Sequence, residues 1–286
     1  MSELQPTQDG FIQAGEYRVH WEYFGEKKRD AVCLLNGLAM HTRAWYPFLP
    51  HVFPEFDVIL YDYLGQGESS DPDIPYSLPD MAGYLTAILD HLGIEKVHLM
   101  GISYGGFVAI EFARLFQERL HTLVLSGILL MPDELFEMYE ALSLLYYRRG
   151  PDVFDIYTHY MYEKIFGDAF VRRIGRENLE PMRKRFEDRY KNRLHCLIRL
   201  TEAQDPFFAS VDQNLPAYRA IRTPTLIMAG AQDRAIPPWV QRRITGILPN
   251  TRFELVEESG HVVYLERPDV FFSTLLAFMR AKSLRF

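Results

Sequence analysis

Short, nearly uninterrupted apolar runs alternate along this chain with segments in which apolar residues recur every three or four positions. The runs are residues 31–35, 58–61, 97–100, 122–126 and 225–229. Such runs are typical of strands that helices cover on both faces, and the spacing of three and four is typical of amphipathic helices. The alternation of the two patterns predicts an α/β protein whose sheet is mostly parallel and flanked by helices.

The remaining core elements follow from local patterns. Residues 17–24 are rich in aromatic and β-branched side chains, which predicts an outer antiparallel strand. A short helix is expected within residues 42–52, a last strand at 252–256 and a closing helix at 270–279. A capping-box pattern from Ser77 to Asp80 starts another helix, whose apolar residues are Met81, Tyr84, Leu85, Ile88, Leu89 and Leu92.

The alternation of strand and helix stops at Pro132. No strand pattern is found from residue 133 to 214, whereas several stretches there have helical spacing and are separated by glycines. The strand pattern then resumes. We therefore expect a core domain formed by residues 1–131 and 217–286, with residues 132–216 inserted into it as a helical cap.

Composition narrows the class of protein. The 286 residues are 48% hydrophobic and 24% charged, so one core can be buried without disulfides. The net charge of -7 argues against a nucleic-acid partner, because a phosphate backbone needs a basic surface. We expect Cys33 and Cys196 to be buried thiols, since their spacing suggests neither a disulfide framework nor a metal site.

The start of the chain does not show the pattern that we expect of a secretory signal. Residues 1–6 lack the basic and apolar regions of a secretory signal. No apolar segment approaches the roughly 18 to 20 residues that a membrane span needs. We expect a cytoplasmic protein, and the sequence leaves both a monomer and a homodimer open.

The segment from Gly101 to Gly106 places Ser103 directly after an apolar run and directly before a helical pattern. A serine on such a strand-to-helix turn is held in a strained backbone conformation. Gly101 and Gly105 permit that turn because neither has a Cβ atom. The hydroxyl would point into the open above the sheet, next to a helix N-terminus that favours negative charge. The segment therefore predicts a nucleophile.

A serine nucleophile needs a base and a carboxylate that orients the base. Of the nine histidines, only His261 follows a strand in a small-residue context, where catalytic groups collect in open α/β sheets. Asp233, just past the run at 225–229, is the best candidate for the acid, and Asp133 is a rival. The predicted triad is Ser103, Asp233 and His261.

With these residues in this order, nearly the whole chain resembles an α/β-hydrolase with a helical cap. The N–H of Tyr104 supplies one oxyanion donor by its position, and the resemblance implies that the N–H of Leu38 supplies the second. Many family members have His-Gly where this chain has Asn36-Gly37, but the donor at residue 38 survives that change. Residues 62–69 resemble an architectural loop of the family. Dehalogenases and epoxide hydrolases have an aspartate in place of the serine, so their chemistry is not expected.

The insertion is strongly aromatic. Between Pro132 and Pro216 it contains seven tyrosines, seven phenylalanines and three methionines. An apolar acyl or aryl group is the expected guest, although most of these side chains could simply join the insertion to the sheet. The residues that we expect to contact a substrate are Tyr146, Tyr147, Met161, Tyr162 and Val262.

The stretch from Arg172 to Arg193 has nine basic and four acidic residues, on a protein that is acidic as a whole. Such a stretch is usually the solvated face of a helix. The alternative is a binding site for an anionic substrate or an acyl carrier, which would make activity fall with added salt.

These residues predict a serine hydrolase that cleaves a small or medium carboxylic ester, with Ser103 acylated, His261 as base and then acid, and Asp233 orienting it. The same groups would also serve a C–C bond hydrolase, a thioesterase or a lactonase. A weaker resemblance, in Asn36-Gly37 and the helical cap, connects the chain to hydroxyacyl transferases that make hydroxyfatty-acid lipids. A non-catalytic small-molecule receptor is a third class. We expect no metal and no cofactor, since neither clustered ligands nor a phosphate-binding loop is found.

Overall fold

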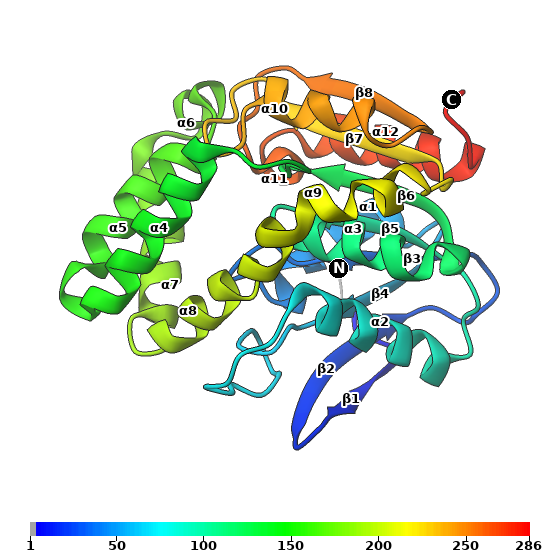
Figure 1. The fold of residues 1–286 in the computed structure, drawn as a ribbon, viewed down its shortest axis with the longest axis horizontal. Helices are drawn as coiled ribbons and strands as arrows, with labels where there is room; N and C mark the ends of the chain where they lie inside the picture. Colours follow the sequence, from blue (N-terminus) through cyan, green and yellow to red (C-terminus); the bar gives the residue numbers. More distant parts are fainter. Residues whose placement is uncertain (1–3) are drawn as a thin grey trace.

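The computed structural model describes residues 4–286. Their strands form one eight-stranded sheet in the order β1-β2-β4-β3-β5-β6-β7-β8 (Figure 1). From β4 to β8 all neighbours in that order are parallel, whereas β2 is antiparallel to both β1 and β4. The prediction of a mostly parallel sheet is confirmed. The strands are β1 (Gln8–Ala14), β2 (Tyr17–Phe24), β3 (Ala31–Leu35), β4 (Asp57–Tyr61), β5 (Val97–Ile102), β6 (Leu120–Ser126), β7 (Thr225–Gly230) and β8 (Thr251–Val256).

The antiparallel edge differs from the prediction in one respect. Residues 17–24 do form an antiparallel strand, but β1 lies outside it and is the edge strand. Sequence patterns miss β1 because it is short of apolar residues and stays exposed or half-exposed along its whole length. Polar side chains on an edge strand protect it from pairing with other chains.

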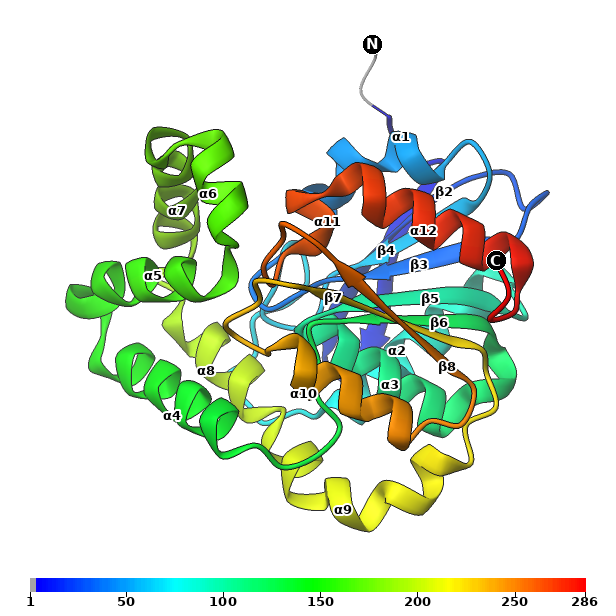
Figure 2. The same cartoon turned by 90° about the horizontal axis from the view of Figure 1, so that it is seen from above.

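Helices cover both faces of the sheet (Figure 2). One face packs against α2 (Leu78–Leu92), α3 (Tyr104–Phe116), α9 (Asp205–Arg219) and α10 (Pro238–Arg242). The other packs against α1 (Leu49–Val52), α11 (Val263–Glu266) and α12 (Pro268–Ala281). Short 3-10 helices are η1 (Thr42–Phe48), η2 (Gln117–Arg119) and η3 (Arg243–Gly246). The helices predicted within residues 42–52 and 270–279 are thus present.

The start of α2 shows how local sequence sets an element. The Ser77 side chain accepts a hydrogen bond from the Asp80 N–H, and the Asp80 carboxylate accepts one from the Ser77 N–H at 2.8 Å. This is the predicted capping box, which satisfies two backbone donors that the first turn leaves free. The helix ends at Gly93 in a left-handed conformation that glycine adopts without strain.

Between β6 and β7 the chain contains helices and no strand, as predicted. Its helices are α4 (Glu134–Arg149), α5 (Pro151–Ile165), α6 (Asp168–Ile174), α7 (Arg176–Tyr190), α8 (Leu194–Glu202) and α9. Helices α4 to α8 stand beside the carboxyl ends of the strands (Figure 2). Helices α4, α5, α7 and α8 share a small, largely aromatic core that includes Tyr147, Phe154, Tyr157 and Tyr190.

Helix α9 belongs to both parts of the molecule. It returns along the sheet, where the Phe207 ring lies 5.4 Å from that of Phe107 on α3. The Tyr218 hydroxyl donates a hydrogen bond of 2.7 Å to Glu111, also on α3. Residue 216, where the sequence analysis ends the insertion, falls inside this continuous helix.

Several sequence expectations concern the chain as a whole. Cys33 and Cys196 are free and buried, as expected. Among residues 4–286, no helix has both the length and the apolar character that a membrane crossing would require. The expectation that the first six residues carry no secretory signal rests partly on residues 1–3, which lie outside the described part of the chain.

Candidate active site

Ser103 stands on the sharp turn between β5 and α3. Its φ of 50° and ψ of -123° are strained for a residue with a side chain. The turn brings backbone so close that a Cβ on Gly101 would lie 2.2 Å from the Gly105 carbonyl oxygen. A Cβ on Gly105 would lie 2.5 Å from the carbonyl oxygen of Asn36. The predicted need for glycine at both positions is confirmed.

His261 and Asp233 meet on the loops after β8 and β7. The two side chains are joined by a hydrogen bond of 2.9 Å between His261 Nδ1 and Asp233 Oδ2. The other carboxylate oxygen accepts the N–H groups of Ala235 and Ile236, each at 2.9 Å. Asp233 is only 4% exposed. These hydrogen bonds therefore replace those that its carboxylate would make with water. Asp233 is therefore held in one orientation toward the imidazole.

Gln241 on α10 is hydrogen-bonded to Asp233 and to the loop after β6. Its amide nitrogen donates to Asp233 Oδ2 at 3.0 Å, and its amide oxygen accepts the N–H of Gly127 at 2.8 Å. Gly127 follows β6, has a φ of 66°, and lies against the imidazole so closely that a Cβ there would be 2.6 Å from His261 Cε1. One buried amide thus ties the loops after β6 and β7 together around the histidine.

The electrostatic surroundings favour the charged form of His261. Burial by itself lowers the pKa of the imidazole, but the charge and hydrogen bond of Asp233, together with the charge of Glu266, raise the pKa above its usual value of 6.5. A base whose pKa lies above that of free histidine accepts a proton more readily. With Nδ1 hydrogen-bonded to the carboxylate, Nε2 is the nitrogen left for proton transfer.

Glu266 fixes the backbone on both sides of His261. Its carboxylate accepts the N–H of Gly260 at 2.8 Å and that of Val262 at 3.3 Å. It also accepts the N–H of Gly167, from the insertion, at 3.0 Å. The His261 N–H itself donates to the carbonyl oxygen of Ile165 at 2.7 Å. The loop that carries the histidine is thus bound directly to the turn between α5 and α6.

Ser103 and His261 line one cavity of about 350 Å³ between the carboxyl ends of the strands and the insertion. Among the described residues, no hydrogen bond joins the two side chains. Catalytic hydrogen bonds are often long in structures without substrate. The cavity wall is mostly apolar, with aromatic side chains that include Phe107, Phe136, Tyr139, Tyr157, Phe186 and Tyr264.

The structure divides the residues that we expected to contact substrate. Met161, Tyr162 and Val262 line the cavity. Tyr147 does not, because it is buried in the core of the insertion, where its hydroxyl donates to that of Tyr157 at 2.8 Å. Tyr146 also lies outside the cavity wall and packs on Tyr157 at 5.6 Å between ring centroids. In this structure neither tyrosine faces the cavity that contains Ser103.

Leu38 and Tyr104, the expected oxyanion donors, both line the cavity. Within residues 4–286, the N–H of Leu38 has no hydrogen-bond acceptor. Tyr104 is the first residue of α3, so its N–H has no acceptor within the helix. Among the described residues neither N–H group has an acceptor, and both residues line the same cavity as Ser103.

Asn36, which stands where many family members have histidine, points away from the cavity. It is fully buried, and its amide oxygen accepts the indole N–H of Trp45 at 2.9 Å. Its amide nitrogen donates to the carbonyl oxygen of Tyr61 at 3.0 Å and to Asp62 at 3.3 Å. Asn36 therefore shapes the loop that presents Leu38.

Asp133, the rival acid, caps a helix. Its carboxylate accepts the N–H of Phe136 at 3.0 Å at the start of α4. A side chain used as an N-cap already satisfies a backbone donor. His261 is paired with Asp233 instead.

Asp71, His195 and Cys196 bring potential metal-ligand atoms within 4.8 Å of one another. Asp71 already forms an ion pair with Arg193, and none of the three lines the cavity. A cation at this position would meet the guanidinium of Arg193. We assign no metal to this group.

Residues 30–268 match the family model described as alpha/beta hydrolase fold. The chain belongs to the α/β-hydrolase family. This α/β-hydrolase is 30% identical over 279 residues to a 2-hydroxy-6-oxononadienedioate/2-hydroxy-6-oxononatrienedioate hydrolase of Paraburkholderia phymatum, covering 92% of this chain and 91% of the relative. It is 29% identical over 255 residues to a protein of Pseudomonas savastanoi pv. phaseolicola provisionally named carbamate hydrolase RutD, covering 87% and 93%.

Among solved structures, this α/β-hydrolase resembles an alpha/beta hydrolase enzyme from a Medee basin deep-sea metagenome library. The TM-score is 0.88 at 23% identity, covering 97% of this chain and 99% of that one. The fold and the named relatives make the protein a hydrolase. The two relatives are named for action on different bonds, so the bond that this chain cleaves is a separate question.

Sequence reasoning missed several residues of the site in this α/β-hydrolase. Gln241 and Glu266 sit on helices and carry no motif, so only the fold shows that they reach the Asp233 and His261 loops. Glu140, Arg185 and Arg189 line the cavity from the insertion. Helical spacing could have placed the two arginines on one face of α7, but which face looks inward depends on tertiary packing.

Proposed function

We propose that this hydrolase cleaves a carboxylic ester through an acyl-enzyme on Ser103. The observation that carries the proposal is the juxtaposition, around one cavity, of a serine on a strained strand-to-helix turn and a histidine hydrogen-bonded to a buried aspartate. Each of these groups has a defined role in acyl transfer.

In the first half of the reaction, Ser103 Oγ attacks the ester carbonyl while His261 Nε2 takes the hydroxyl proton. Asp233 stabilises the imidazolium that forms. The carbonyl oxygen becomes an oxyanion, and the free N–H groups of Leu38 and Tyr104 donate to it. The tetrahedral intermediate then collapses, the C–O bond breaks, and the alcohol leaves with the proton from His261.

In the second half, water replaces the alcohol. His261 takes a proton from the water, whose oxygen attacks the acyl carbon of the Ser103 ester. The second tetrahedral intermediate expels Ser103 Oγ, which recovers its proton from His261, and the carboxylic acid leaves. The reaction needs no cofactor, because the chain supplies nucleophile, base and oxyanion donors.

The cavity wall supports an apolar acyl or aryl group as the part of the substrate next to Ser103. Met161, Tyr162 and Val262 are proposed to contact it, together with the aromatic residues of the wall. A cavity of about 350 Å³ suits a small or medium substrate.

A fluorophosphonate probe tests the proposal. It should label Ser103 in the folded protein, and Ser103→Ala should abolish labelling and lower ester hydrolysis by at least roughly 10³-fold. Nitrophenyl esters of graded chain length should be cleaved with an optimum at short to medium acyl groups. Absence of labelling in folded protein would contradict the acyl-enzyme.

A C–C bond hydrolase is the second candidate, since the relative at 30% identity is named for a dienedioate or trienedioate substrate. A carbamate is favoured by the other relative's name. Thioesters and lactones are further substrates for the same apparatus. Parallel assays of all five substrate types on wild type and Ser103→Ala would rank them by kcat/KM.

Acyl transfer and non-catalytic binding are the remaining alternatives. A transferase would form a new ester when a hydroxy acceptor is added, and the acyl-enzyme would turn over faster. A receptor would bind small molecules without any burst of product. The strained Ser103 and its free oxyanion donors support a catalytic role over simple binding.

A further inference from the structure

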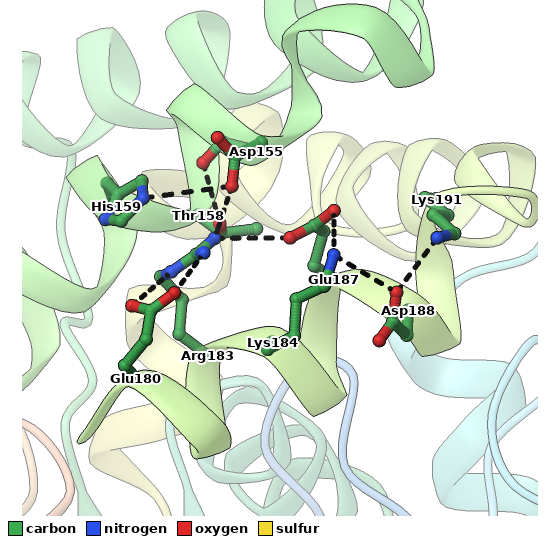
Figure 3. A network of polar contacts seen from close by, with 9 residues as sticks. All are labelled: Asp155, Thr158, His159, Glu180, Arg183, Lys184, Glu187, Asp188 and Lys191. Carbon is green, nitrogen blue, oxygen red and sulfur yellow. Dashed lines mark hydrogen bonds and ion pairs between the residues drawn. The ribbon is translucent and has the colours of Figure 1, made fainter. Parts of the chain in front are cut away.

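Helix α7 presents two different faces. Glu180, Arg183, Lys184, Glu187, Asp188 and Lys191 lie on the face seen in Figure 3, where ion pairs join them to one another and to Asp155 on α5. Each cation of this network contacts at least one carboxylate. No cation of this network is therefore left without a carboxylate partner.

The opposite face of α7 lines the cavity. Met182, Arg185, Phe186 and Arg189 follow one another at intervals of three, one and three residues, which places them on one side of a helix. All four belong to the wall of the cavity that contains Ser103. Within residues 4–286, neither Arg185 nor Arg189 forms an ion pair or a side-chain hydrogen bond. Both side chains are exposed toward solvent or cavity.

Two guanidinium groups one helical turn apart, without partners and beside a catalytic cavity, attract an anion. Burial is the first cause that lowers the pKa of His41, which also lines the cavity, and the charge of Arg189 is the second. A neutral His41 still has one ring N–H that can donate a hydrogen bond to an anion.

The acidic residue of the wall does not oppose this field at neutral pH. Glu140 on α4 lines the cavity, and burial together with the charges of Asp205 and Glu137 raises the pKa of its carboxyl to about 8. It also accepts a hydrogen bond of 2.6 Å from Gln204. A carboxyl with this pKa is mostly protonated at pH 7.

We infer that Arg185 and Arg189 form a subsite for a carboxylate on the substrate itself. This inference rests on the proposed ester hydrolysis and narrows its substrate class to esters of acids that carry a second, free carboxylate. The subsite and Ser103 share one small cavity, so the anion and the scissile bond belong to the same small molecule. The aromatic wall between them would hold the apolar part of the acid.

A pair of matched esters tests the inference. The first is mono(4-nitrophenyl) adipate, which keeps a free carboxylate, and the second is 4-nitrophenyl methyl adipate, in which that carboxylate is blocked. Wild type should prefer the free acid by at least about tenfold in kcat/KM. Arg185→Gln combined with Arg189→Gln should remove that preference, mainly through a rise in KM for the free acid.

Lys191→Gln is the matched control, because it removes one positive charge from the outer face of the same helix. It should keep the preference. Added salt should raise KM for the free acid in wild type, since exposed charges are screened. Equal kcat/KM for the two esters in wild type, or a preference that survives in the double variant, would overturn the subsite.

A binding measurement separates the subsite from the catalytic proposal. Calorimetry with adipate on Ser103→Ala should show binding that weakens about tenfold when both arginines become glutamine. If neither ester releases nitrophenolate, the proposed hydrolysis fails, and this titration still decides the subsite. Absence of adipate binding, or equal affinity with and without the arginines, would contradict it. Inorganic phosphate that displaces adipate at equal concentration would contradict the assignment to a carboxylate.

Discussion

Gly167 in the insertion and Gly260 beside His261 are packed backbone against backbone. A Cβ on Gly167 would lie 2.6 Å from the backbone nitrogen of Gly260, and one on Gly260 would lie 2.3 Å from the nitrogen of Gly167. Both N–H groups donate to the same carboxylate, that of Glu266. The position of the proposed base therefore depends on a contact with a segment almost a hundred residues earlier in the chain.

Gly167→Ala is expected to displace the His261 loop. The added methyl group has no room beside the Gly260 backbone, so the loop or the α5–α6 turn must shift. A shift of about 1 Å in a catalytic group can cost on the order of 100-fold in rate. We expect kcat to fall by at least about tenfold.

The control for this variant is Gly83→Ala, a helical glycine with no atom within 4 Å of the added Cβ. It should leave kcat unchanged and raise the melting temperature slightly, because alanine is the better helix former. Unchanged activity in Gly167→Ala, measured on folded protein, would contradict the tight contact.

Glu266→Gln should destabilise the protein and lower its catalytic rate. The carboxylate accepts three backbone N–H groups, and an amide would turn one of its two acceptor oxygens into a donor. Hydrogen bonds to a charged group contribute roughly 1.5–3 kcal/mol each. We expect the free energy of unfolding in urea to fall by about that amount. A variant as stable and active as wild type would show that the carboxylate is dispensable.

The proposed role of His261 predicts a pH profile. Only the neutral imidazole can take the Ser103 proton, so kcat/KM should rise with pH through a pKa above the ordinary 6.5. In Asp233→Asn, burial still lowers the pKa but the carboxylate no longer raises it. The acid limb of the profile should then move to lower pH, while the maximal rate falls by roughly 10³ to 10⁴.

The His261–Asp233 pair should also make the stability of the fold depend on pH. Its contribution to stability should fall as pH rises, whereas the activity should increase. Because the folded pKa of His261 is raised, its charged form stabilises the fold at pH values below 6.5, and this contribution is lost as pH rises through the raised pKa. The free energy of unfolding of wild type minus that of Asp233→Asn should therefore be larger at pH 5.5 than at pH 8.5. A difference independent of pH would contradict the raised pKa.

Glu140→Gln should remove the rise in KM that we expect for anionic substrates of the wild type at alkaline pH. As pH rises through about 8, wild-type Glu140 ionises and adds a negative charge to the cavity. The KM of wild type for mono(4-nitrophenyl) adipate should then increase, whereas the glutamine variant should keep its neutral-pH value. The methyl-blocked ester serves as the control, and a parallel rise for both esters would exclude repulsion by Glu140.

The proposed catalytic residues could be predicted from the sequence, whereas most of the residues that line the cavity could not. Ser103, Asp233 and His261 each follow a strand of the parallel part of the sheet, and parallel strands bring such loops to one edge of the sheet. Local patterns therefore suffice to bring them together. Asp133 could be separated from Asp233 only in the structure, where its carboxylate caps α4.

The insertion was less predictable because helix faces are assigned by their neighbours. Tyr147 and Tyr162 are both aromatic residues on amphipathic helices, yet the first is buried among α4, α5 and α7 while the second lines the cavity. Arg183 and Arg185 are two positions apart and face opposite ways. A spacing of three and four residues shows which side chains share one face of a helix, but not whether that face packs on the core or lines the cavity.

The hydrogen bond from the His261 N–H to the carbonyl oxygen of Ile165 has a consequence for engineering this enzyme. A cap transplanted from another family member should alter reactivity along with selectivity, since the end of α5 helps to hold His261, the proposed general base. Chimeras should retain activity when the exchanged segment ends before Ile165 and restarts after Gly167. Grafts that replace this turn would need a compensating change at Glu266.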